Sequence, residues 1–112
     1  MDVVLLVLGD GGQSASAAEL GQRTGRQAAW VDDLRAAGLL KDGGHVDGPA
    51  LRVRTAAGRP AVVDVPVALG IHSWLLLAVA DMDAAVAAAR SCPEAEFGDV
   101  RVLPLDPEGQ MW

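Results

Sequence analysis

The chain has 112 residues, of which 51% are hydrophobic and 21% charged, and its formal net charge is −6 at pH 7. This length suits one globular domain with a single core. The negative charge argues against a surface for nucleic acid or for anionic membranes, because both require clustered Lys and Arg. Cys92 is the single cysteine, so an intrachain disulfide and a cysteine-based metal cluster within one subunit are excluded.

The first predicted element is a strand over residues 2–9, "DVVLLVLG", which ends at glycines. Both of its faces are apolar, so we expect it in the middle of a sheet. The apolar run near the N-terminus follows an acidic residue, Asp2, in place of a basic region, and this run has only strand length. It therefore matches neither a signal peptide nor a membrane span, and we expect a cytoplasmic protein with no membrane association.

A helix is predicted over residues 16–38, because Ser16 and Glu19 form a capping box and Gly38 is typical of a helix end. The 3.6-residue period predicts that one face of this helix packs inward, made of Ala17, Leu20, Thr24, Ala28, Val31 and Leu34. Residues 39–50, "LLKDGGHVDGPA", are predicted as a turn-rich connection in which His45 is exposed to solvent.

The second half of the chain is predicted to alternate strands and one helix. Residues 51–55 and 60–65 are typical of a hairpin. The segment "GIHSWLLLAVA" (70–80) is the strongest strand, and strict alternation would place His72 and Trp74 on one face of it. A helix over 81–92 and a last strand over 98–105 follow, before a C-terminal tail over 106–112.

This order of elements predicts an α+β fold: one domain, with its core in residues 2–105, forming a ferredoxin-like sandwich with an inserted β-hairpin. Two helices can cover only one face of the antiparallel sheet, whereas the central strands are apolar on both faces. The open face must be buried by something, and a second copy of the chain is the simplest partner. We therefore predict a homodimer that packs sheet to sheet.

His72 is the strongest candidate for chemistry, because a histidine can act as a general base near neutral pH. Asp64 or Asp10 could orient its ring. The alternative is a packed histidine with one satisfied hydrogen bond, which the absence of an evident acid–base pair in the sequence favours.

Trp74 is a candidate ligand-binding residue. The favoured alternative is that its indole, which is apolar with one N–H donor, lies in a dimer interface. Asp10 lies in "GDGGQS" (9–14), a glycine-rich connection whose backbone N–H groups could hold an anion. Its pattern matches neither a P-loop nor a dinucleotide fingerprint.

Asp81 and Asp83 at the start of the second helix suit capping and the helix dipole better than a metal site. Cys92, beside a proline at the helix end, is predicted to be a small buried hydrophobe. We expect neither a metal nor a cofactor.

The chain resembles the YCII-related, DGPF-domain family over residues 2–105. The resemblance is carried in order by "VVLLVLGD", "AAGLLKDGG", "ALRVRTAAGRPAVVDVPVA", "LLLAVADMDAAVAAARSCP" and "GDVRVLPL". It implies a ferredoxin-like fold that dimerises into an α+β barrel, and a role linked to sigma factors in transcription. Some relatives are enzymes that act on small ring compounds through a His–Asp pair.

Two departures from the family pattern bear on function. The motif Asp-Gly-Pro-Phe is replaced by "DVPV" at residues 64–67, and the first helix has no histidine where the catalytic relatives carry one. The leading hypothesis is therefore a non-catalytic dimer with a binding or regulatory role, which acts through a protein partner and does not bind nucleic acid directly. The alternatives are a small enzyme with His72 as its base, and a small-ligand-binding protein with a cleft near His72 and Trp74.

Overall fold

The computed structural model describes residues 1–10, 15–46, 51–64 and 70–108, and at positions 56, 63 and 64 it describes the backbone alone. The elements follow one another along the chain as β1 (Asp2–Gly9), α1 (Ala17–Ala36), β2 (Leu40–His45), β3 (Leu51–Ala56), β4 (Arg59–Asp64), β5 (Gly70–Ala78), α2 (Met82–Arg90), the 3-10 turn η1 (Pro93–Glu96) and β6 (Asp99–Pro104).

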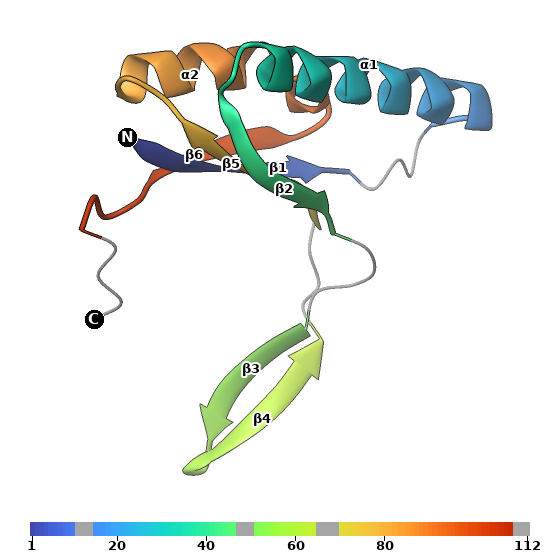
Figure 1. The fold of residues 1–112 in the computed structure, drawn as a ribbon. Helices are drawn as coiled ribbons and strands as arrows, with labels where there is room; N and C mark the ends of the chain where they lie inside the picture. The colour runs from blue at the N-terminus through green and yellow to red at the C-terminus, as the bar shows by residue number, and fades with distance from the viewer. Residues whose placement is uncertain (11–14, 47–50, 65–69, 109–112) are drawn as a thin grey trace.

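Four strands form one antiparallel sheet in the order β2-β5-β1-β6. Both helices lie on the same side of this sheet (Figure 1). The protein is thus α+β, and its strand order is compatible with a ferredoxin-like sandwich. The other two strands, β3 and β4, pair only with each other within the described residues and project from the side of the sheet opposite the helices (Figure 1).

The core lies between the sheet and the helices. Val3, Leu5 and Val7 of β1 alternate with less buried residues, as a strand with one covered face requires. The core is completed by side chains from the other elements: Trp30, Leu34, Leu75, Leu77, Val79, Ala85, Ala89 and Cys92. The opposite face of the sheet, which we call the open face, presents Val4, Leu6, Arg101 and Leu103 from β1 and β6 and Trp74, Leu76 and Ala78 from β5.

The ends of α1 are those predicted. The Ser16 side chain accepts a hydrogen bond from the Glu19 N–H (3.2 Å), and Gly38 follows the helix with a φ of 74°. The predicted inward face is correct only at its C-terminal end, where Leu34 is buried and Val31 packs against the core. The other residues that α1 buries are Arg23, Gln27 and Trp30, which the prediction did not include.

Large side chains set the rotation of α1. Trp30 Nε1 donates a hydrogen bond to the Ala88 carbonyl (3.2 Å), which ties α1 to α2 and brings Leu34 into the core. Of the predicted face only Leu34 is buried, and Leu20 is exposed. Thr24, Ala28 and Val31 line the groove described below.

Residues 40–45 form an edge strand, β2, where the sequence predicted a turn-rich connection. Its two glycines permit the pairing with β5. A Cβ on Gly43 would lie 2.9 Å from the Trp74 carbonyl oxygen, and a Cβ on Gly44 would lie 3.2 Å from Trp74 Nε1. Glycine here signals close approach of two strands rather than a turn.

The second helix and its surroundings follow the prediction closely. Asp81 caps α2 by accepting a hydrogen bond from the Ala84 N–H (2.9 Å), and Asp83 lies in the first turn. Cys92 is buried, as expected. None of the helices in the described part of the chain is both long and apolar enough to span a membrane.

Candidate functional site

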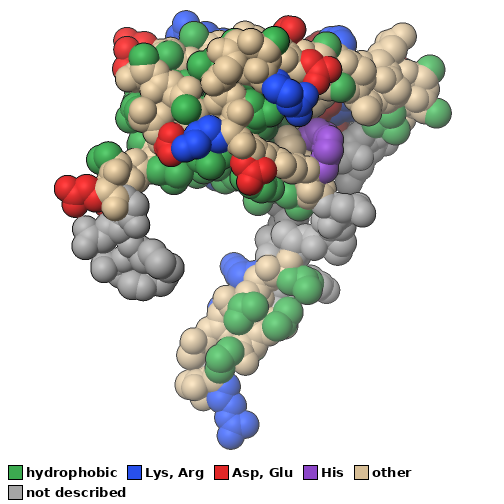
Figure 2. Space-filling view, viewed as in Figure 1, with side chains coloured by type: hydrophobic (Ala, Val, Ile, Leu, Met, Phe, Trp, Pro, Cys, Tyr) green, Lys and Arg blue, Asp and Glu red, His purple; other side chains and the backbone are tan. Residues whose placement is uncertain are grey.

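A groove of about 550 Å³ lies between α1 and the edge of the sheet formed by β2 and β5. Ala28 and Val31 of α1 and Leu40 and Leu75 of the strands supply apolar surface, and Thr24 and Gln27 supply polar atoms. His45 and His72 lie among the residues that line it, and Figure 2 shows histidine at the molecular surface. A volume of this size accommodates a small organic molecule.

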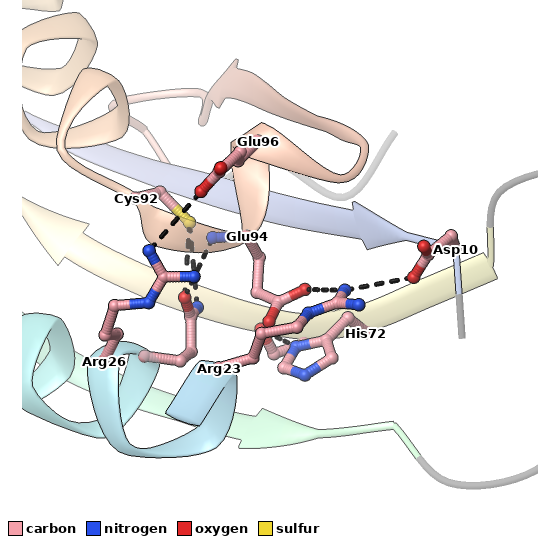
Figure 3. Close-up of polar contacts among 9 residues, drawn as sticks. Asp10, Arg23, Arg26, His72, Cys92, Glu94 and Glu96 are labelled. Atoms are coloured by element: carbon pink, nitrogen blue, oxygen red, sulfur yellow. Dashed lines mark hydrogen bonds and ion pairs between the residues drawn. The ribbon is translucent and has the colours of Figure 1, made fainter. Parts of the chain in front are cut away.

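His72 reaches this groove because of an irregularity in β5. Val7 pairs with Ser73 and Leu8 pairs with Ile71, so His72 is an extra residue with no partner on β1. Such a bulge interrupts the alternation of faces and re-aims a side chain. The His72 ring lies 3.1 Å from the Ser73 hydroxyl, through Nδ1, and close to Arg23 and Glu94 (Figure 3).

His45 comes to the same place from the neighbouring strand. It pairs with Ser73, and the next residue, Val46, donates a backbone hydrogen bond to the His72 carbonyl (2.9 Å). The two imidazoles make an edge contact, with 5.2 Å between ring centroids and an interplanar angle of 74°. Strand pairing therefore fixes two groups that can both donate and accept hydrogen bonds at one end of the groove.

Burial lowers the pKa of His72 from its ordinary value of 6.5. Glu94 opposes this effect, whereas His45 and Arg23 add to it. Near neutral pH the ring is therefore held in its neutral form. When Ser73 Oγ accepts a hydrogen bond from Nδ1, the lone pair of Nε2 is free to accept a proton from another molecule.

A buried ion cluster lies beside His72. Arg23 Nη2 contacts Glu94 Oε2 and Asp10 Oδ1, each at 3.0 Å (Figure 3). Its guanidinium also stacks on the Phe97 ring, 3.6 Å from the centroid. Arg23 and Glu94 are buried, and Arg23 Nε has no hydrogen-bond partner among the described residues. The cluster joins α1 to the end of β1 and to η1, and so holds α1, one wall of the groove, in place.

Gln27 connects this cluster to Cys92. Its Oε1 accepts a hydrogen bond from the Glu94 N–H (3.4 Å), and its amide is 3.7 Å from Cys92 Sγ. Burial raises the pKa of the Cys92 thiol, so the sulfur stays protonated and is a poor nucleophile. The cysteine packs against the site but does not supply its chemistry.

The candidate residues predicted from the sequence fall in different places. Both residues border the groove, but on different faces of β5: the bulge turns His72 toward α1, whereas Trp74 pairs with Leu6 and keeps its indole on the open face, against Gly44. The prediction that His72 and Trp74 share one face is therefore wrong. Asp10, at the end of β1, is hydrogen-bonded to Arg23. Asp64 ends β4, and its side chain lies outside the description, as do residues 65–67 of the "DVPV" segment.

Two of the site's features were missed by sequence reasoning. His45 is exposed, as predicted, but it lies in the edge strand β2 and not in a turn, and its contact with His72 is not evident from the sequence. The sequence also gives no role to Arg23. The sequence signal for the burial of Arg23 is weak. Arg23 lies four residues before Gln27 and seven before Trp30, so the three residues share one face of the helix.

Comparison with protein-family models gives no match to this chain, and comparison with curated proteins gives none. Within the part of the chain that the structure describes, no three His, Cys, Asp or Glu side chains are grouped so that they could hold a metal ion.

Proposed function

We propose that this protein binds a small organic ligand in the groove between α1 and the β2–β5 edge. One observation carries the proposal: the bulge in β5 turns His72 toward a groove and sets it against His45, where regular alternation would have kept the two side chains apart. Bulges that re-aim a side chain are over-represented beside functional sites.

The lining of the groove indicates the class of ligand. Ala28, Val31 and Leu40 offer an apolar wall, while the two histidines offer hydrogen bonds at one end. The exposed cations beside the groove are already paired: Arg35 with Asp32 (2.7 Å) and Lys41 with Asp2 (2.9 Å). A small ring compound with one hydroxyl or carboxyl group, placed against the histidines, fits this distribution.

The test is a two-dimensional NMR titration of the ¹⁵N-labelled protein with catechol, 4-hydroxybenzoate and indole. We expect shift changes confined to α1, β2 and the first half of β5 for at least one hydroxylated probe, and weaker binding of indole, which lacks the hydroxyl. His72→Gln should weaken binding of that probe by about tenfold, as loss of one good hydrogen bond in a half-buried site does.

Arg90→Gln is the matched control, because Arg90 is exposed at the end of α2 and does not line the groove. This variant should bind like the unaltered protein. Shift changes scattered over the surface, or a His72→Gln variant that binds as well as Arg90→Gln does, would contradict the proposal.

A second candidate is acid–base catalysis by His72, and it is favoured by the neutral ring anchored through Ser73. In this case a bound compound with an acidic C–H bond should exchange that hydrogen with D₂O faster in the presence of protein. Ethyl acetoacetate is a suitable probe, and the exchange should fall to the uncatalysed rate in His72→Gln. Exchange that is equally fast in both proteins would eliminate this candidate.

We also propose that the protein is a homodimer packed through the open face, as the resemblance to YCII-related proteins implies. Support comes from four apolar residues of the open face: Val4, Leu6, Trp74 and Leu76. The helices cannot cover these residues, because both helices lie on the other side of the sheet. The α+β barrel would be the product of this pairing. A transcription-associated role through a protein partner stays a prediction of the resemblance.

A further inference from the structure

The β3–β4 hairpin has two chemically different faces. Directly opposed residues of an antiparallel pair lie on the same face, so the pairing of Val53 with Val62 makes one face apolar, together with Leu51. Arg52 and Arg54 point to the other face, where Arg59 also lies as the partner of residue 56. The hairpin is therefore unevenly amphipathic: Leu51, Val53 and Val62 share one face, to which the register also assigns Asp64 at its end, and the three arginines share the other face with Ala61 and residue 63.

Nothing in the described residues of the protomer covers the apolar face. Leu51, Val53 and Val62 are exposed by 63%, 65% and 62%. Figure 2 shows hydrophobic side chains along the visible face of the hairpin and a basic side chain at its tip. A lone two-stranded hairpin is at best marginally stable in water, so this element requires a surface to pack on.

The charge of the hairpin is opposite to that of the rest of the chain. Three of the nine basic residues lie in 51–64, together with a single acidic residue, Asp64. The remaining sequence holds six basic and fourteen acidic residues. A basic hairpin is attracted to an acidic body, and a second copy of this chain is such a body.

The direction of the hairpin is consistent with that partner. It projects from the side of the sheet on which the open face lies, well beyond the sheet itself (Figure 1). A body packed against the open face would lie alongside the hairpin and would meet its apolar side chains.

We infer that the β3–β4 hairpin is an arm that clasps a second copy of the chain, with its apolar face packed on the partner's open face. This inference rests on the proposed homodimer and assigns it a second contact region. It is independent of ligand binding in the groove, so the two can fail separately.

The first experiment compares dissociation constants of the dimer by sedimentation equilibrium in the full chain. Val53→Asp combined with Val62→Asp places two charges on the apolar face. We expect the dissociation constant of the dimer to rise about tenfold or more. Arg52→Gln combined with Arg54→Gln alters the opposite face of the same strands. It should weaken the dimer at low salt and have little effect at 0.5 M NaCl, since the attraction between exposed charges is screened.

An aspartate pair that leaves the dissociation constant unchanged, in a protein that is dimeric, would overturn the inference and leave the dimer standing. If the unaltered protein is monomeric even at about 100 µM, a concentration at which weak dimers form, both the arm and the dimer are overturned. Neither result bears on ligand binding, which the NMR titration measures separately.

A second measurement does not depend on the stability of the variants. A photo-crosslinking amino acid at position 62, in a mixture of ¹⁴N- and ¹⁵N-labelled chains, distinguishes crosslinks between chains from crosslinks within one. We expect mixed-isotope crosslinks from position 62 to β1 or β5 of the other chain. Crosslinks only within a chain, or only from hairpin to hairpin, would contradict the assigned contact.

Discussion

At the scale of single residues, Arg23 is the charge on which the site depends most. It lies between Glu94 and Asp10, and Glu94 is buried with it. Removing one partner of a buried ion pair leaves the other charge buried without a counter-ion, which strongly destabilises the fold. Replacing both partners by apolar residues usually has a much smaller effect on stability. The cluster is therefore best tested by deleting the cation.

Arg23→Met should lower the free energy of unfolding by about 3–5 kcal/mol, because the buried Glu94 carboxylate loses its counter-ion. Urea denaturation at pH 7 measures the change. Arg26→Met is the control one turn away on α1: Arg26 pairs with Glu96 at 3.4 Å, both side chains are exposed, and we expect a loss below about 1 kcal/mol. Equal losses in the two variants would show that the Arg23 cluster is not a stabilising centre.

His72 should make stability depend on pH in a defined direction. Burial lowers its pKa in the folded state, so the unfolded chain takes up a proton near 6.5 and the folded protein only at lower pH. Unfolding therefore takes up a proton in the window below pH 6.5. The free energy of unfolding should fall as the pH drops through that window, and level off below the folded-state pKa.

The His72→Gln variant removes this contribution. The difference in unfolding free energy between the unaltered protein and His72→Gln, measured in urea at pH values from 7.5 to 5, should decrease toward low pH. The imidazole proton resonance of His72 should titrate below 6.5 in the same range. A titration midpoint at or above 6.5 would show that the Glu94 charge outweighs burial.

At the scale of elements, we expect replacement of glycine by alanine to destabilise the protein in β2 and to stabilise it in α1. Gly43→Ala places a Cβ 2.9 Å from the Trp74 carbonyl oxygen and must push the edge strand away from β5, at a cost of about 1–3 kcal/mol. Gly25→Ala meets nothing within 4 Å and should stabilise α1 by about 0.5–1 kcal/mol.

Thermal and urea denaturation of the two alanine variants provide the comparison. A Gly43→Ala protein as stable as Gly25→Ala would mean that β2 does not approach β5 as closely as the structure has it. Such a result would also remove the pairing that places His45 beside His72, since Gly43 and His45 belong to the same strand.

The same elements show why some assignments can be made from sequence and others cannot. Helix caps depend on side chains within three residues of the helix end, so Ser16, Gly38 and Asp81 are readable locally. The buried face of α1 depends on what lies opposite. Leu20 stays exposed, whereas Arg23 is buried because Glu94, 71 residues away, comes to meet it.

At the scale of the whole molecule, the open face should control association. Leu103→Glu places a charge on the open face, and we expect it to weaken the proposed dimer by about tenfold or more. Leu20→Glu is a matched control, because the two leucines are exposed to nearly the same degree, 43% and 40%, and Leu20 lies on α1 on the helix side of the sheet. Light scattering coupled to gel filtration over a range of concentrations gives the masses.

Leu20→Glu should have the same mass as the unaltered protein at every concentration. If both glutamate variants behave like the unaltered protein, the dimer is not formed through the open face. If Leu20→Glu alone dissociates, the helix layer forms the interface instead.

The sequence by itself determined the α+β class, the β3–β4 hairpin, the strands β1, β5 and β6 and the helix ends, because alternation, helical periodicity and capping act over a few neighbouring residues. It also marked His72 and Trp74 as the side chains to examine. Only the tertiary structure decided that "LKDGG" and His45 form an edge strand, that Arg23 is buried among carboxylates, and that a bulge turns His72 into a groove. These features arise from pairing between segments roughly 30 to 70 residues apart in sequence, and no local pattern encodes such contacts.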